Sequence, residues 1–265
     1  MWLPANIAAV CAFVLFGVSL VVHGRFPGVA SPSREAACVF TLYTMWRLFN
    51  RVDVRLDGAA ERGLQIWHFE RAVGLGSERW LQERVIGLSP VVQFMNGYYA
   101  IAHVPAMIAF LFWMFFRRRS DYGYWRALLA LSTGADVLIR LVPVAPPRLL
   151  PELGFVDTAR AYNQSVYGGF GRGVSDQLAA MPSIHVGWAA LIAWALWQVG
   201  GRRGRAIGIG HLVLTCLAVV LTGNHWWLDG IVAAALLPPI AWVWMRVVRF
   251  VPLERFSVRL GASVR

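Results

Sequence analysis

The sequence contains no lysine, so each of its 25 basic side chains is an arginine. It has only 3 cysteines, and an odd number of cysteines, two of them in apolar runs, does not predict a framework of disulfide bonds. Internal repeats, low-complexity segments and a nucleotide-binding glycine loop are also absent. Residues 1–22 carry no charged side chain, so they lack the basic region with which a cleaved signal peptide begins.

Hydrophobic residues dominate the composition instead. They make up 58% of the 265 residues, and several apolar runs reach the roughly 20 residues that a helix needs to cross a bilayer. This pattern predicts a protein that crosses the membrane several times. A net charge of +11 is also compatible with nucleic-acid binding, but we interpret it as a signal of membrane topology and expect no nucleic-acid partner.

The predicted fold class is an all-α integral membrane protein, with about six transmembrane helices in a bundle and interfacial helices near the N-terminus. The expected spans are residues 3–22, 89–116, 125–143, 183–199, 206–222 and 227–248. Residues 36–50 are apolar but short and contain an arginine, so we expect an interfacial or re-entrant helix there. Residues 60–86 mix apolar and charged residues in a pattern that is typical of a helix lying in the membrane interface.

These elements divide the chain into three regions. Residues 1–88 form an N-terminal transmembrane and interfacial segment, residues 89–250 a transmembrane core, and residues 251–265 a cytoplasmic tail. Within the core, residues 144–181 form a long loop rich in proline and glycine. Loops of that length are usually functional or disordered.

Arginines in short loops predict the orientation of the core. Residues 116–126 and 200–205 are strongly basic and the last span ends in two arginines, so these places are expected on the cytoplasmic side. The 144–181 loop then faces the periplasm or the exterior, and the plasma membrane is the expected location. Two arginines after the first span give the opposite signal, but they stand in a long segment, where the rule is weak.

Two histidines and an aspartate interrupt apolar runs near the predicted outer surface. His185 stands in "MPSIHVGWA", and both His225 and Asp229 stand in "TGNHWWLDG". The two residues of the second stretch are four apart, so a helix places them on the same face. An ionisable side chain inside a bilayer costs roughly 2.5–3.5 kcal/mol, so such residues are candidates for a functional site. We expect His211 to be a hydrogen-bonded packing group, while His103 either packs in the same way or lines a polar cavity.

Polar residues at the ends of neighbouring spans are candidates for an anion site. Arg148 follows the proline run of "RLVPVAPPRLLP", and its planar guanidinium suits bidentate phosphate binding. Arg140 is a second candidate, although Asp136 four residues earlier leaves a structural ion pair as an alternative. Ser183 and Asn224 precede two spans, where they either cap a helix or help to bind an anion at its N-terminus.

Three of these stretches together resemble a known family. "PVAPPR" at 143–148, "PSIH" at 182–185 and "HWWLD" at 225–229 resemble the type 2 phosphatidic acid phosphatase superfamily, and within it the branch of inositol phosphorylceramide synthases and sphingomyelin synthases. The resemblance covers roughly residues 89–245. It implies a core of six transmembrane helices with the active site at the non-cytoplasmic face.

The chain departs from the phosphatase members of that family in each block. Their first block begins with lysine and ends in Arg-Pro, whereas this chain has Pro147 before Arg148. Their second block reads Pro-Ser-Gly-His, whereas this chain has Pro-Ser-Ile-His at 182–185. Their third block carries Ser-Arg where this chain has Ala218 and Val219. The missing arginine favours the synthase-like branch, and it favours a phosphodiester over a more highly charged phosphomonoester.

Phosphoryl transfer needs in-line positioning of the reacting groups and stabilisation of the charge on the phosphoryl oxygens. We assign His225 as the nucleophile that forms a phosphohistidine, Asp229 as the group that fixes its tautomer, and His185 as the general acid and base. The expected phosphate-binding residues are Arg148, Arg140, Ser183 and Asn224. The reaction is expected to need neither a metal ion nor another cofactor.

The expected function is transfer or hydrolysis of a lipid-linked phosphoryl group at the non-cytoplasmic face, with head-group transfer favoured over lipid phosphate hydrolysis. The expected partners are a lipid phosphate or phospholipid substrate and the bilayer, and no oligomeric state is predicted. Two other hypotheses stay open. The two histidines and the aspartate are plausible zinc ligands, and intramembrane ionisable residues also occur in transporters of lipids or ions.

Overall fold

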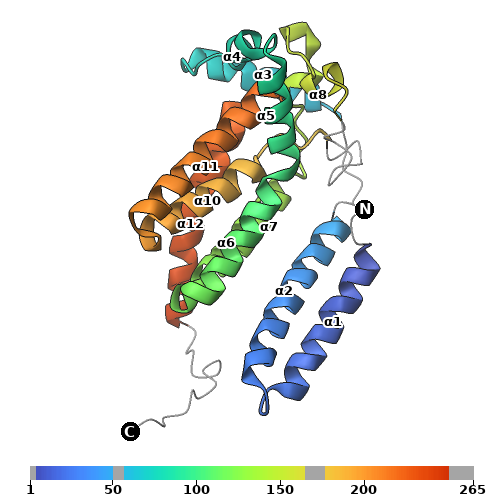
Figure 1. Ribbon diagram of the computed structural model, residues 1–265. Coiled ribbons are helices and arrows are strands. Elements are labelled where there is room, and N and C mark those ends of the chain that lie inside the picture. Colours follow the sequence, from blue (N-terminus) through green and yellow to red (C-terminus); the bar gives the residue numbers. More distant parts are fainter. Residues whose placement is uncertain (1–3, 50–56, 165–176, 251–265) are drawn as a thin grey trace.

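The structure of the chain is a computed structural model that describes residues 4–49, 57–164 and 177–250 (Figure 1). Within these ranges the chain is helical, apart from loops and one isolated parallel bridge between Val144 and Ala179. The predicted all-α class is therefore confirmed for the described residues. The predicted tail, residues 251–265, lies outside them. The helices are α1 (Ala5–Val22), α2 (Pro27–Phe49), α3 (Ala59–Ala72), α4 (Glu78–Val85), α5 (Ser89–Ile101), α6 (His103–Arg117), α7 (Arg119–Ile139), α8 (Thr158–Ala161), α10 (Ile184–Val199), α11 (Gly201–Leu221) and α12 (Trp227–Phe250).

Helices occupy all six places where the sequence predicts a membrane span. Among the described helices, α1, α11 and the part of α12 over Trp227–Val248 are long and apolar enough to cross a bilayer. The pair α5 and α6 meets the same criteria as one unit that is bent by 52°. α10 is apolar but has only 16 residues, and α7, with 21 residues, carries several charged side chains. The structure thus gives three candidate spans, or four with the bent pair, and the six-span bundle stays a prediction.

The bend between α5 and α6 lies at Ala102, just before Pro105. Proline has no backbone N–H, so it removes the hydrogen bond that a continuous helix would make to the carbonyl of Ile101, and its ring crowds that turn. The bend therefore has a local cause in the sequence. It directs the last turn of α5 and the first turn of α6 toward α10, where both contribute aromatic rings to one cluster.

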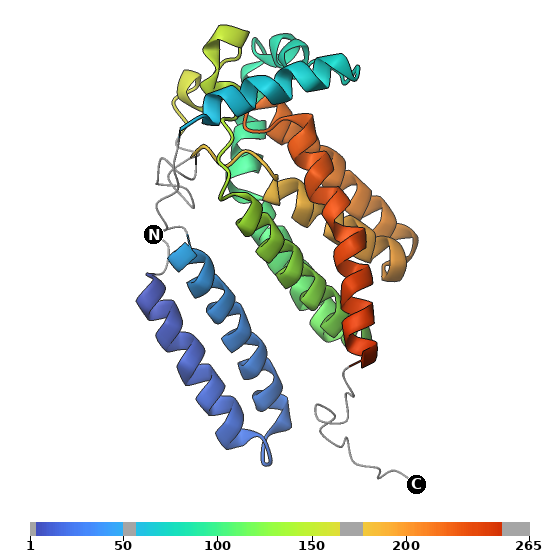
Figure 2. The ribbon, with the colours of Figure 1, turned by 180° about the vertical axis from the view of Figure 1, so that it is seen from behind.

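The N-terminal region differs from the prediction. Residues 36–50 were expected to form a short interfacial or re-entrant helix, but the helix found there, α2, begins at Pro27 and packs antiparallel against α1 (Figures 1 and 2). Proline is favoured at the first helical position because its missing N–H has no partner there anyway. Glu35 of α2 pairs with Arg126 of α7 and accepts a hydrogen bond from Tyr122. These contacts join α2 to α7.

Residues 60–86 form two helices, α3 and α4, which we call the cover. The expected single helix is therefore divided, and its place in the membrane interface stays a prediction. α3 and α4 cover the end of the bundle where α11 ends and α12 begins (Figures 1 and 2). α3 approaches the proline-rich loop so closely that a Cβ atom on Gly63 would lie 2.8 Å from the carbonyl oxygen of Ala145. Two acidic side chains of the pair, Glu70 and Glu78, are fully buried. An amphipathic sequence pattern does not distinguish such a cover from a helix that lies on the bilayer.

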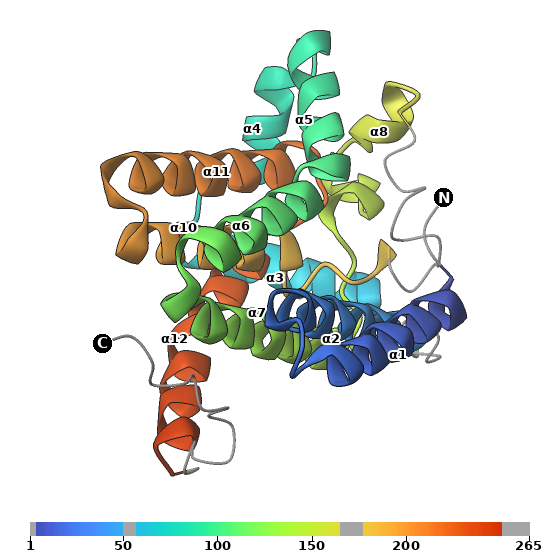
Figure 3. The ribbon, with the colours of Figure 1, turned by 60° about the horizontal axis from the view of Figure 1, so that its bottom comes forward.

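The main core lies between α6, α7, α10 and α12, and Figure 3 shows these helices with α1 and α2 beside α7. It includes the buried residues Met114, Leu128, Leu191 and Leu237. α10 and α11 approach each other closely, since a Cβ atom on Gly208 would lie 2.9 Å from the Cα atom of Ala193. Small residues at such crossings allow van der Waals packing between helices within a membrane. The core thereby holds the first turns of α10 and α12 in fixed positions.

The two ends of the bundle differ in character. The turn between α6 and α7 and the turn between α10 and α11 lie at the end away from α3 and α4 (Figures 1 and 2). These two turns contain the arginine-rich stretches of the sequence. The described parts of the 144–181 loop lie at the opposite end, with short 3₁₀ turns at Pro147–Leu149 and Pro151–Leu153.

Candidate active site

Three segments that are far apart in the sequence meet beneath α3 and α4. They are the loop after α7, the segment that leads into α10, and the turn between α11 and α12. The backbone N–H of Ser183 donates to the carbonyl of Asp229 at 3.1 Å, which joins the second segment to the third. The N–H of Arg148 donates to the carbonyl of Gly223 at 2.9 Å, which joins the first to the third. The three blocks noted in the sequence are thus neighbours in space.

His225 precedes α12, and Asp229 lies in the first turn of that helix. The Nδ1 atom of His225 lies 3.3 Å from Oδ2 of Asp229, and both side chains are buried. The same Oδ2 atom accepts the backbone N–H of Trp226 at 2.8 Å. The aspartate therefore binds the imidazole and also caps the helix, and the spacing of four residues does bring the two side chains together.

A backbone carbonyl fixes the tautomer of His225. Its Nδ1 atom lies 2.7 Å from the carbonyl oxygen of Ala180. A carbonyl oxygen only accepts hydrogen bonds, so Nδ1 must carry the proton. In the neutral imidazole, Nε2 then carries the free electron pair. Sequence reasoning missed Ala180, because a main-chain carbonyl leaves no signal in the type of the residue.

His185 lies in the first turn of α10, beside His225. Their ring centroids are 5.6 Å apart. Tyr99 stacks on His185 at 4.4 Å, and His103 meets it edge-on at 4.2 Å. The Nδ1 atom of His185 is buried and has no hydrogen-bond partner in the described part of the chain, so no protein group there holds a proton on it.

The sequence left the role of His103 open, and the structure places this residue in the histidine cluster through its contact with His185. Nothing in the spacing of the two residues indicated this contact, because they are on different helices. His211 lies elsewhere, where its Nδ1 atom is 2.7 Å from the hydroxyl of Tyr98. It is a hydrogen-bonded packing group, as expected.

Arg148 is buried next to the turn that carries His225. Its Nε atom donates to Oδ1 of Asn224 at 2.8 Å, and its Nη1 atom lies 3.6 Å from Oδ2 of Asp157. The amide nitrogen of Asn224 donates to Oγ1 of Thr222 at 2.8 Å, which orients the amide oxygen toward the guanidinium. Asn224 thus positions the arginine. The sequence predicted helix capping or anion binding for Asn224, and positioning of Arg148 is neither of these roles.

Ser183 and Arg140 differ in how closely they approach this centre. The hydroxyl of Ser183 accepts the backbone N–H of Val186 at 3.4 Å, and its side chain is fully buried. It therefore caps α10. Arg140 follows directly after α7, and its contact with phosphate is still a prediction.

Carboxyl groups from the cover bind the start of α12, and sequence reasoning missed them. Oε1 of Glu70 accepts the N–H of Leu228 at 2.7 Å, and Oε1 of Glu78 accepts the N–H of Trp227 at 3.2 Å. Burial, together with the hydrogen bond and the charge of Glu78, raises the pKa of Glu70 to about 9. At neutral pH Glu70 therefore holds a proton. Arg71 lies 3.0 Å from Glu78 and balances the remaining charge.

The arrangement provides an imidazole nitrogen with a free electron pair, a second imidazole and a buried guanidinium at the end of the bundle. Across residues 4–49, 57–164 and 177–250, no three histidine, cysteine or acidic side chains are grouped as metal ligands. Trp226 is buried, and its indole N–H donates to the carbonyl of Ala145 at 3.0 Å. It packs against the proline-rich loop.

Comparisons with known proteins give one finding. A family model described as the PAP2 superfamily matches residues 64–243. The match begins within α3 and ends in α12, so it includes α4, most of α3 and all the candidate site residues, and leaves out α1 and α2. Comparisons with curated proteins and with solved structures each find no match.

Proposed function

Because the chain belongs to the PAP2 superfamily, we propose that it is a membrane enzyme that transfers or hydrolyses a lipid-linked phosphoryl group through a phosphohistidine. Membership supports a phosphatase-type enzyme, and helices apolar enough to cross a bilayer support a membrane protein. The observation that carries the mechanism is the contact of His225 Nδ1 with the carbonyl of Ala180. It leaves Nε2 as the nitrogen with a free electron pair.

In the first half-reaction, Nε2 of His225 attacks phosphorus and the bond from phosphorus to the leaving oxygen breaks. The imidazole gains positive charge, which the carboxylate of Asp229 beside Nδ1 stabilises. His185 donates a proton to the leaving oxygen, which departs as an alcohol. The products of this step are the free alcohol and a phosphohistidine.

In the second half-reaction, an acceptor hydroxyl attacks the same phosphorus atom. Deprotonated His185 takes the proton of the acceptor, and the nitrogen–phosphorus bond breaks to restore His225. Within the described residues no group binds Nδ1 of His185, which supports a role in which its proton leaves and returns. Water as acceptor completes hydrolysis, and a lipid alcohol completes transfer.

Arg148 neutralises the phosphoryl oxygens in both steps. Its guanidinium is held by Asn224, and preorganised donors of this kind lower the barrier because they need no reorganisation during the reaction. Arg140 adds positive potential from the end of α7. The backbone N–H of Ser183 donates to the carbonyl of Asp229 and so fixes the start of α10 beside the start of α12.

We favour head-group transfer, because the phosphate pocket has few cations. Where phosphatase members of the family carry an arginine, Val219 is buried against Val186 and Val220. Its carbonyl accepts the N–H groups of Asn224 and His225 at 3.0 and 3.2 Å, so the position lies beside the nucleophile. A less cationic pocket discriminates less against a phosphodiester, which carries one negative charge. Lipid phosphate hydrolysis is the second candidate, and family membership supports it equally.

We place the site at the non-cytoplasmic face of the plasma membrane. The support is the position of the arginine-rich turns at the opposite end of the bundle (Figure 1).

Purified protein incubated with lipid phosphates and phosphodiesters tests the function. Each donor is offered with and without inositol or diacylglycerol, mass spectrometry identifies the products, and a His225→Ala variant is the control. A new phospholipid that depends on the acceptor supports transfer. Inorganic phosphate as the sole product under every condition leaves a phosphatase, and turnover by the His225→Ala variant contradicts the mechanism.

A further inference from the structure

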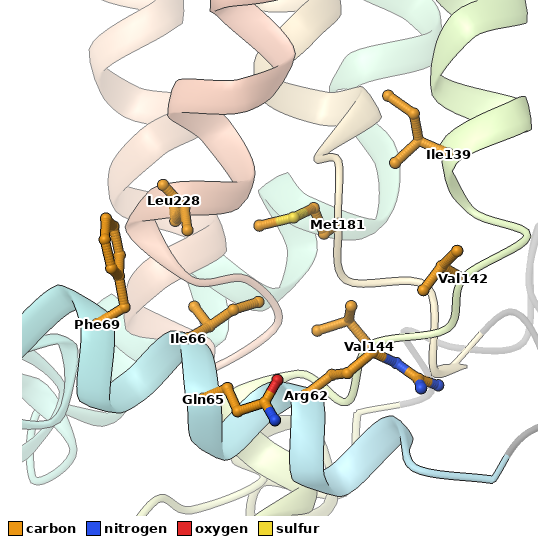
Figure 4. A pocket seen from close by; sticks show the side chains of 9 residues that line it. All are labelled: Arg62, Gln65, Ile66, Phe69, Ile139, Val142, Val144, Met181 and Leu228. Atoms are coloured by element: carbon orange, nitrogen blue, oxygen red, sulfur yellow. The ribbon is translucent and has the colours of Figure 1, made fainter.

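A cavity of about 410 Å³ lies between α3 and the segments that carry the site (Figure 4). Its wall is formed by four side chains of α3 together with residues from the end of α7, the loop that follows, the segment before α10 and the start of α12. Ligand pockets in proteins measure about 300–1,000 Å³ and are lined mainly by apolar side chains. The cavity has both properties.

Its lining is almost entirely apolar. Seven of the nine lining side chains are hydrophobic, and the two polar ones, Arg62 and Gln65, both come from α3. Figure 4 shows them on the α3 side, with Met181 and Leu228 across the cavity. The guanidinium of Arg62 is held in place, since its Nε atom donates to the carbonyl of Pro143 at 2.6 Å. The polar part of the wall is therefore confined to α3.

The cavity adjoins the site because two of its lining residues stand next in sequence to residues of the site. Leu228 directly precedes Asp229, and Met181 directly follows Ala180, whose carbonyl binds His225. The same wall that lines the cavity thus carries the groups that orient the nucleophile. A ligand seated there would lie next to the reacting atoms without contacting them.

The side chains at the mouth of the cavity indicate what fills it. Phe69 and Val142 are 50% and 55% exposed, although both are large apolar residues. Leu138 and Leu141, which stand near Ile139 and Val142 in the chain, are 62% and 40% exposed. An apolar opening beside an apolar surface fits the hydrocarbon region of a bilayer better than water. The occupant is then a hydrocarbon chain that enters from the membrane.

We propose that this cavity binds one hydrocarbon chain of the lipid substrate and so places its phosphoryl group at His225. This inference rests on the proposed function and adds a binding site for the lipid chain. Arg62 and Gln65 would face the polar linkage between the chain and the head group. The site would therefore select for long-chain substrates over short-chain analogues of the same head group.

A Val142→Trp substitution tests the inference, because Val142 lines the cavity and its exposure leaves room for a larger side chain. The measurement is the ratio of kcat/KM for a long-chain phosphatidic acid to that for dihexanoyl phosphatidic acid. We expect the ratio to fall by about tenfold, which is the loss expected when about two methylene groups of the lipid chain are no longer buried. The matched control is Ile207→Trp on α11, where an exposed apolar residue lies outside the cavity, and its ratio should equal that of the unaltered protein.

A binding measurement separates this inference from the proposed function. A phosphatidic acid with a diazirine in one acyl chain is photolysed with the His225→Ala protein, and the labelled peptides are identified by mass spectrometry. Labels concentrated in residues 59–72 and 139–144 support the chain site even where no turnover is found. Labels confined to α1, α11 or the end of α12, or an unchanged ratio in active Val142→Trp protein, overturn the inference and leave the proposed function standing.

Discussion

The Nε atom of Arg148 lies 2.8 Å from the amide oxygen of Asn224, the residue directly before His225. The candidate phosphate-binding group and the candidate nucleophile are thus attached to one short turn. Gly223 makes this possible, since its φ of +67° is favourable for glycine and a Cβ atom there would lie 3.3 Å from that of Arg148. A shift of this turn would therefore move both groups together.

Replacing His225 by alanine should abolish the reaction. We expect activity to fall by about 10⁴-fold or more, since the loss of a nucleophile removes the whole covalent pathway. A donor with labelled phosphate, quenched in acid, should label the unaltered protein and leave His225→Ala unlabelled. His185→Ala should slow both half-reactions but still permit a trapped intermediate. Labelling of the His225→Ala protein would disprove the assignment.

Arg148→Lys should impair the reaction although it keeps the charge. Lysine lacks the planar fork that binds two phosphoryl oxygens, and a charge-assisted hydrogen bond contributes about 1.5–3 kcal/mol, so kcat/KM should fall about 10- to 100-fold. Asn224→Ala should cause a smaller loss, because it releases the guanidinium without removing it. Arg140→Lys is the control, with the mildest effect if it acts only at a distance. Equal losses in all three variants would contradict the assignment of Arg148.

Chelators should leave the activity unchanged. The assigned groups provide nucleophile, proton transfer and charge neutralisation without a metal ion. The assay compares turnover before and after dialysis against EDTA. Complete inhibition that zinc reverses would support the alternative in which His185, His225 and Asp229 bind zinc.

Glu70 should make stability depend on pH. Its pKa is raised from 4.5 to about 9, so between these values the folded protein holds a proton that the unfolded chain has released. Stability should therefore fall as the pH rises from about 4.5 to about 9. Thermal unfolding in detergent should show this fall in the unaltered protein and a flatter profile in Glu70→Gln. Glu83→Gln, at an exposed pair with Arg79, is the control, and an unchanged slope in Glu70→Gln would refute the role of Glu70.

Sidedness can be measured with single cysteines. In a variant whose three cysteines are replaced by serine, Glu152→Cys in the site loop should react with an impermeant thiol reagent in intact cells. Ser120→Cys in the arginine-rich turn should react only after lysis. Both residues are exposed, so access to the compartment alone decides the result. The reverse pattern would place the chemistry on the cytoplasmic side.

The sequence predicts the helices of the core well, because long apolar runs between basic loops leave few alternatives. The predicted span at 3–22 corresponds to α1, and that at 227–248 lies within α12. The contact between His225 and Asp229 also follows from their spacing. These features depend on local sequence, which is why local reasoning finds them.

Features that depend on contacts between distant segments were missed. Glu35 of α2 pairs with Arg126 of α7, which lies 91 positions away in the sequence. Glu70 and Glu78 stand in a segment that was expected to lie in the membrane interface, and their burial was not predicted from its pattern. The carbonyl of Ala180 acts through the main chain. In each case the partner lies in another segment, so the residue pattern of one segment alone does not predict the contact.

The capping of α12 has a consequence for the charge balance of the site. The backbone N–H groups of Trp226, Trp227 and Leu228 are bound by carboxyl groups of the protein itself. The positive end of this helix dipole, which binds phosphate in many proteins, is therefore already neutralised here. The negative charge of a substrate must then be met by guanidinium and imidazolium groups rather than by the start of α12. Substituting Arg148 should therefore weaken substrate binding far more than substituting the carboxyl groups that bind the start of α12.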